Sequence, residues 1–231
     1  MKIRLCNNQL KIVNSEKHLG HLLTNKQSIM NIDEVMKDMK IKTNIICNEF
    51  SSLPYAARIV IFNSQCLSLY GCPLWNLQDT KIEDLCKTWR VCCRRILGIP
   101  NRTHNELLPE LMNTFPIINI IQERMINFYM NGLNHSDSVV VRFFQNSITS
   151  HLSYSVANVN KILNRIGMRY FDFFTYKKKD VKKKFKCIQT HDNDSVISLL
   201  KDLLDMRDGI KMSNLNHSEI RDIIQFVCVT Q

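Results

Sequence analysis

The feature that most constrains the fold is an apolar stripe of helical period in residues 80–97. Apolar side chains recur there three and four residues apart, as expected for one face of a helix. They are Ile82, Leu85, Cys86, Trp89, Cys92, Cys93, Ile96 and Leu97. Thr80 and Glu83 have the spacing of a capping box, and Gly98 and Pro100 end the pattern. Because such a face must be buried, the stripe predicts helices packed on one another.

Two further helices are predicted before this one. Asn31 and Glu34 begin the first, which ends near residue 50, and Pro54 opens the second. Their apolar faces are formed by Val35, Met39, Ile46 and Phe50 and by Tyr55, Ile59, Phe62, Cys66 and Leu69. Short connections between three amphipathic helices predict a compact bundle over residues 28–100.

The flanking regions complete a mainly α prediction. Residues 1–27 alternate in places around Asn7 and Asn8, which predicts a short β hairpin, with a third extended segment at 17–24. Residues 101–170 are predicted to form a helical connector. Residues 171–231 combine a basic, aromatic segment with two C-terminal helices near 194–206 and 217–228.

Composition excludes several classes of protein. No apolar run approaches the roughly 18 to 20 residues that span a bilayer, and no secretory signal is visible, so we expect a nuclear or cytoplasmic protein without a membrane partner. The chain has nine cysteines, an odd number without zinc-finger spacing. We therefore expect buried, reduced thiols and no metal site.

A basic excess points to a polyanionic partner. The net charge is +10, and the excess collects in residues 1–50, 51–100 and, most strongly, 151–200. The predicted helix at 79–97 carries Lys87, Arg90, Arg94 and Arg95 away from its apolar stripe, and these four could follow a phosphate backbone. The alternative reading is an ordinary solvated face.

A second candidate site lies in residues 171–186. Phe171, Phe173, Phe174 and Tyr176 precede a run of lysines that includes Lys178 and Lys182. Aromatic rings can stack on bases while lysines contact the backbone. A solubilising run with buried aromatic side chains explains the same pattern.

No residue is predicted to be catalytic. The sequence has no phosphate-binding glycine loop, no Gly-x-Ser-x-Gly elbow, no His-Glu-x-x-His and no Asp-Asp pair. The acidic residues mostly lie near predicted helix N-termini, where the helix dipole favours them. His18 and His21 lie in an extended segment, where side chains three apart face opposite ways.

Three segments resemble a known family in their residue order. They read Lys-His-Leu-Gly-His-Leu-Leu-Thr-Asn at 17–25, Ser-Leu-Tyr-Gly-Cys-Pro-Leu-Trp at 68–75, and Trp-Arg-Val-Cys-Cys-Arg-Arg-Ile-Leu-Gly-Ile-Pro-Asn-Arg-Thr-His-Asn at 89–105. In this order they resemble the region after the catalytic palm in reverse transcriptases of LINE-like non-LTR retrotransposons. The resemblance covers roughly residues 1–135, and the third segment is its most specific part.

The resemblance implies roles for parts of the chain. Residues 1–27 would be the end of the palm with the primer grip, and Lys17, His18 and Gly20 would lie by the primer end, although His18 stands where Tyr is usual. Residues 28–100 would be a thumb that holds an RNA–DNA template–primer. The family's two magnesium ions are held by palm aspartates, including a Tyr-x-Asp-Asp turn, and the sequence has no such motif.

The sequence therefore predicts a nucleic-acid-holding fragment of an RNA-directed DNA polymerase, inactive by itself. The alternative is a helical protein-interaction module or an inert retrotransposon remnant. That alternative expects the charged segments at 87–95 and 177–186 on unrelated faces, and an exposed apolar groove. A sequence-specific DNA-binding protein comes third, because no recognition helix can be placed.

Overall fold

The structure, a computed structural model of the chain, is described for 32–149 and 154–169. It is also described for four short strands before residue 25 and for positions 175, 177, 179–181, 183–185 and 187. Its helices are α1 (Ile32–Glu49), α2 (Tyr55–Cys66), α3 (Thr80–Leu97), α4 (Leu107–Leu111), α5 (Ile117–Leu133), α6 (Ser138–Thr149) and α7 (Tyr154–Arg165), with the short 3₁₀ helix η1 (Cys72–Leu74). The described chain is mainly helical, as predicted.

The strands form two separate antiparallel pairs. β1 (Arg4–Leu5) pairs with β2 (Asn8–Gln9), and β3 (Ser15–His18) pairs with β4 (His21–Thr24). The chain therefore reverses within 17–24, where the sequence predicted one extended segment. His18 lies directly across from His21. The prediction of one extended segment is wrong here, because His18 and His21 belong to two neighbouring strands.

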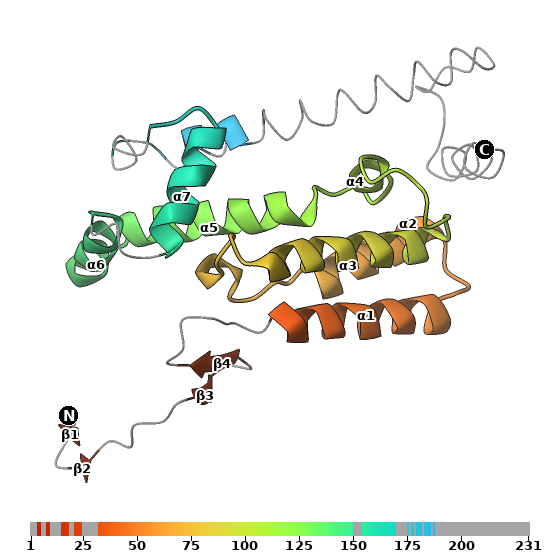
Figure 1. Cartoon of the computed structure of the whole chain (residues 1–231), viewed down its shortest axis with the longest axis horizontal. Coiled ribbons are helices and arrows are strands. Elements are labelled where there is room, and N and C mark those ends of the chain that lie inside the picture. Colours follow the sequence, from red (N-terminus) through yellow and green to blue (C-terminus); the bar gives the residue numbers. More distant parts are fainter. Residues whose placement is uncertain are drawn as a thin grey trace.

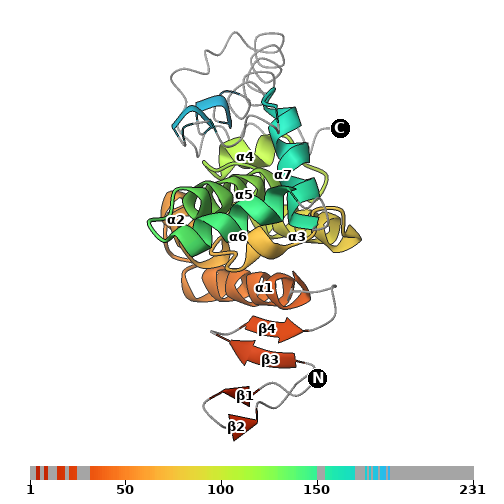
Figure 2. The same ribbon diagram turned by 90° about the vertical axis from the view of Figure 1, so that its left-hand side faces the viewer.

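Helices α1, α2 and α3 pack on one another, and α5 covers the other side of α2 and α3 (Figures 1 and 2). Asp33, in the first turn of α1, pairs with Lys81 at the start of α3. The thiol of Cys47, near the end of α1, lies 3.7 Å from the carbonyl oxygen of Arg95 near the end of α3. These contacts show that α1 and α3 run parallel.

One apolar core joins the bundle to the connector. Buried side chains form a single cluster from Ile32 to Phe185, to which α3 contributes Leu85 and Ile96. At the contact between α5 and α6, a Cβ added to Gly132 would lie 2.3 Å from the ring of Phe144, so only glycine fits there. Residues 28–100 and 101–170, separated in the sequence analysis, share this core where the structure describes them.

Two helix boundaries differ from the prediction. The N-cap of α3 is Asp79, whose carboxylate accepts a hydrogen bond from Lys81 N at 2.9 Å, in place of a Thr80 capping box. Helix α2 ends at Cys66, before the predicted Leu69, because Arg124 on α5 donates hydrogen bonds to the carbonyl oxygens of Leu67 and Ser68. Leu69 is still buried.

Candidate nucleic-acid interface

The predicted basic face lies on α3, which ends in a glycine cap. Gly98 adopts φ 65°, and the amide of Ile99 donates to the carbonyl oxygen of Arg94 at 3.1 Å. This left-handed turn sends the chain back along the helix. The residues after the cap determine which of the arginines before it are buried and which are exposed.

Arg94 does not face solvent. Its side chain is 8% exposed, and Nη2 donates to the carbonyl oxygen of Thr103 at 2.6 Å and to Oδ1 of Asn105 at 2.7 Å. Burial, together with the charge of Arg90, lowers the pKa of Arg94. The expectation that Arg94 lines an open groove is therefore wrong. The connector packs over the Arg94 side chain, whose hydrogen bonds hold the connector against the end of α3.

Lys87 is exposed but already paired with acids. Its Nζ lies 3.2 Å from Glu83 and 3.3 Å from Asp84 on the same helix. The hydrogen bond to Glu83 and, to a smaller extent, the hydrogen bond to Asp84 raise the pKa of Lys87. The positive charge is thus largely balanced within one turn of the helix.

Arg90 and Arg95 lie on different flanks of α3. Arg90 is half-buried, and its charge acts on Cys86 and on Arg94. Arg95 is exposed and lies on the flank that faces α1. The four basic residues therefore do not form one continuous phosphate track.

Two cations, one on α1 and one on α3, lie near the contact between these helices. Lys40 on α1 and Arg95 on α3 are both exposed, and both lie near enough to the Cys92 thiol for their charges to act on it. We call this pair the seam cations. Neither makes an ion pair among the described residues, whereas Lys42 pairs with Asp38 at 2.7 Å. The sequence analysis missed Lys40 because the cluster joins residues 55 positions apart.

The remaining predicted residues are mostly outside the described side chains. Lys17 and His18 belong to β3, and only their backbone is described, with Lys17 opposite Leu22. Gly20, Lys178 and Lys182 lie outside the described residues. Their proposed contacts with nucleic acid stay predictions.

The described part of the basic segment contributes to the core. Val181 and Phe185 are buried, while Lys183 and Lys184 are exposed. The aromatic residues predicted as a stacking platform, Phe171, Phe173, Phe174 and Tyr176, lie outside the described residues. Both readings of these four aromatic residues therefore stay predictions.

The core thiols are chemically quiet. Burial raises the pKa of Cys66 to about 12 and that of Cys72 to about 11. Burial also raises the pKa of Cys93 well above its ordinary value. Because the thiolate is the reactive form, these side chains serve as small apolar groups. In the described part of the chain, no three His, Cys, Asp or Glu side chains could together hold a metal ion.

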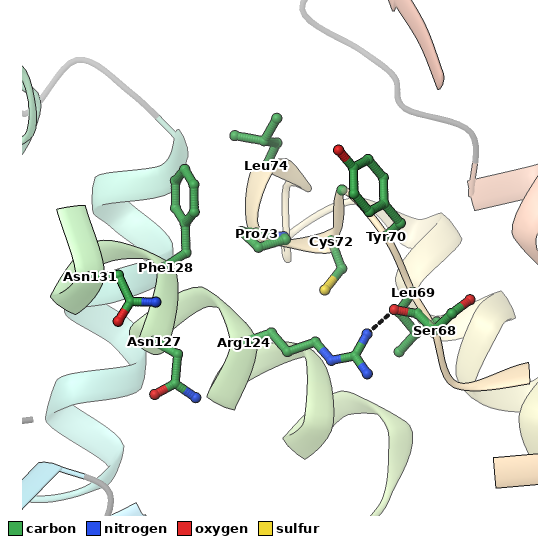
Figure 3. A pocket seen from close by; sticks show the side chains of 11 residues that line it. Ser68, Leu69, Tyr70, Cys72, Pro73, Leu74, Arg124, Asn127, Phe128 and Asn131 are labelled. Carbon is green, nitrogen blue, oxygen red and sulfur yellow. Dashed lines mark hydrogen bonds between the residues drawn. The ribbon is translucent and has the colours of Figure 1, made fainter. Parts of the chain in front are cut away.

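The structure also contains a pocket that the sequence analysis did not predict. Residues 68–74 and helix α5 enclose about 460 Å³ (Figure 3). The 68–74 side supplies Tyr70, Pro73 and Leu74, and α5 supplies Arg124 and Phe128. The 68–75 segment was the part of the sequence that could have indicated this pocket. The residues of α5 that complete the pocket lie about fifty positions later in the chain.

Comparisons with protein-family models, curated proteins and solved structures found no match. Among the described helices, none combines the length and apolar character that crossing a membrane requires.

Proposed function

We propose that this chain holds an RNA–DNA template–primer, as the thumb and connector of a reverse transcriptase similar to those of LINE-like retrotransposons. The seam cations Lys40 and Arg95 would contact phosphates of the backbone. Polymerisation would need palm carboxylates and their magnesium ions, which the family resemblance assigns to a motif that this sequence lacks. The proposed activity of this chain is therefore binding alone.

One observation carries the proposal. Lys40 and Arg95 are both exposed, and neither makes an ion pair among the described residues, whereas Lys42, Lys81 and Lys87 are each balanced by a carboxylate. An unbalanced pair of cations attracts phosphate, because binding releases the counterions condensed on the nucleic acid. Balanced cations gain much less from the same contact.

The resemblance supports the proposal in a different way. The 89–105 segment forms the end of α3, its glycine cap and the connector around Arg94. Most of its residues thus build the fold that presents Arg95, and Arg95, which belongs to the same segment, would itself contact the backbone. A thumb needs such a rigid edge to grip a backbone without reading its sequence.

The test is binding of an RNA–DNA hybrid at low salt by the full chain. The double variant Lys40→Glu/Arg95→Glu should bind at least about tenfold more weakly, and the slope of log K against log salt should decrease in magnitude by about two. The matched control is Lys42→Glu/Lys87→Glu, which changes the net charge equally at ion-paired positions. This control should bind almost as well as the parent.

Two outcomes would overturn the proposal. Equal losses in the two double variants would mean that net charge, rather than the seam, governs binding. A parent chain that binds no hybrid at low salt would favour the helical interaction module or inert remnant. One observation favours the interaction module: the apolar rim of the pocket, where Tyr70 is 59% and Leu74 52% exposed.

A further inference from the structure

The pocket between residues 68–74 and α5 has the dimensions of a ligand site. Its volume of about 460 Å³ falls within the range of sites that hold small organic molecules. The site is independent of the seam cations, since none of its lining residues belongs to α1 or α3. The question is what kind of molecule its walls would recognise.

Two aromatic rings stand at the mouth of the pocket. Figure 3 shows Tyr70 and Phe128 on opposite sides of Pro73 and Leu74. Tyr70 is 59% exposed and Phe128 is 38% exposed, so part of each side chain is open to solvent. Rings presented in this way favour a flat, aromatic ligand.

Both walls are held in place before any ligand arrives. Phe128 makes edge contacts with Tyr129 and Phe144, with ring centroids 5.8 and 5.3 Å apart. On the other wall, the η1 turn is held from α7, because Asn158 Nδ2 donates to the carbonyl oxygen of Trp75 at 2.9 Å. A preformed pocket loses little conformational entropy on binding.

The charge in the pocket is positive and unbalanced. Arg124 donates to the carbonyl oxygens of Leu67, at 2.6 Å, and Ser68 (Figure 3), and it makes no ion pair among the described residues. Among the described residues, no Asp or Glu lines the pocket. A ligand with a negative group would balance this guanidinium, which a purely apolar ligand would leave unpaired.

We propose that this pocket binds one unstacked nucleotide of a single-stranded nucleic acid. The base would stack on Tyr70 or Phe128, and its phosphate would lie toward Arg124. A nucleotide combines a flat aromatic ring with an adjacent anion, the two features that the walls and the charge select. Cys72 takes no covalent part, because burial keeps its pKa at about 11 and the group stays a thiol.

The test uses a short single-stranded oligonucleotide that contains 2-aminopurine, whose fluorescence falls when the base stacks. The full chain should quench it, and Tyr70→Ser should bind about tenfold more weakly. Tyr70→Phe should retain binding, because the stacking ring remains. The matched control is Phe143→Ser, an aromatic residue 66% exposed on α6 and outside the pocket, which should behave like the parent.

Two further measurements separate the proposal from its rivals. The 5′-monophosphate of 2-aminopurine riboside should bind more tightly than the riboside, and equal affinities would remove the role of Arg124. Unchanged quenching in Tyr70→Ser would overturn the site. So would displacement of the oligonucleotide by an acidic aromatic peptide at lower concentration than by unlabelled oligonucleotide. The Lys40→Glu/Arg95→Glu variant should keep the quenching even where it loses the hybrid duplex, so the two proposals fail separately.

Discussion

The C-terminal end of α3 and the seam between α1 and α3 treat neighbouring arginines in opposite ways. At the helix end, the connector covers Arg94, and Nη2 of its guanidinium donates hydrogen bonds to Thr103 and Asn105. At the seam, Arg95 stays exposed beside Lys40. Both residues occupy the polar side of the same amphipathic helix. The difference shows that a basic side chain is buried and stabilises the fold where another segment packs over it, and stays open to a ligand where none does.

The largest expected effect tests the covered end. Arg94→Ala removes two hydrogen bonds from a charged donor and leaves the buried carbonyl oxygen of Thr103 without this partner, so the free energy of unfolding should fall by about 3 kcal/mol. Urea unfolding followed by tryptophan fluorescence measures it, since Trp75 and Trp89 are both buried. The free energy of unfolding of Arg94→Lys should lie between those of the parent and of Arg94→Ala, because lysine keeps the positive charge but lacks the planar guanidinium. A loss of less than about 0.5 kcal/mol in Arg94→Ala would show that Arg94 does not hold the connector against α3.

The next effect tests the turn that brings the connector back. Gly98→Ala should lower the free energy of unfolding by about 1.5 kcal/mol, because φ 65° is costly for a residue with a Cβ. The added Cβ would lie 3.9 Å from Tyr55 Oη, an ordinary contact, so the cost is conformational. Gly98→Asn should cost less, since Asn tolerates this region better. The same unfolding measurement would contradict this reasoning if Asn and Ala cost the same.

The third effect concerns thiols buried by the same packing. Burial raises the pKa of Cys66 from 9.0 to about 12, so the folded state favours the neutral thiol. This stabilisation is complete below pH 9 and is lost as the pH rises from 9 toward 12. Between pH 9 and pH 10 the parent should lose about 1 kcal/mol more stability than Cys66→Ala. If the free energy of unfolding falls equally in the two proteins over this pH range, the raised pKa of Cys66 is contradicted.

The smallest effect tests the open seam. Lys40→Gln and Arg95→Gln should each change the free energy of unfolding by less than about 0.5 kcal/mol, because neither side chain is buried. Urea unfolding of both variants beside Arg94→Ala gives the contrast directly. A large loss in Arg95→Gln would mean that the seam, like the connector, uses its arginine for folding.

Local signals in the sequence were sufficient for most of the helices. The apolar period and the glycine stop predicted a helix over 79–97, and α3 occupies Thr80–Leu97. Pro54 correctly marked the start of α2. The predictions hold because these signals act within one or two turns of chain. Phe50 shows their limit, since its place on the predicted stripe did not keep it from being 38% exposed.

Tertiary structure alone decided which charges and rings could serve a ligand. The burial of Arg94 depends on the path of the connector, and the seam joins Lys40 to an arginine 55 residues away. The pocket likewise pairs residues 68–74 with side chains of α5. Periodicity assigns a residue to a face of its own helix, but solvent exposure depends on distant segments that pack over that face. The helices could therefore be predicted from the sequence, whereas the candidate binding surfaces could be identified only from the tertiary packing.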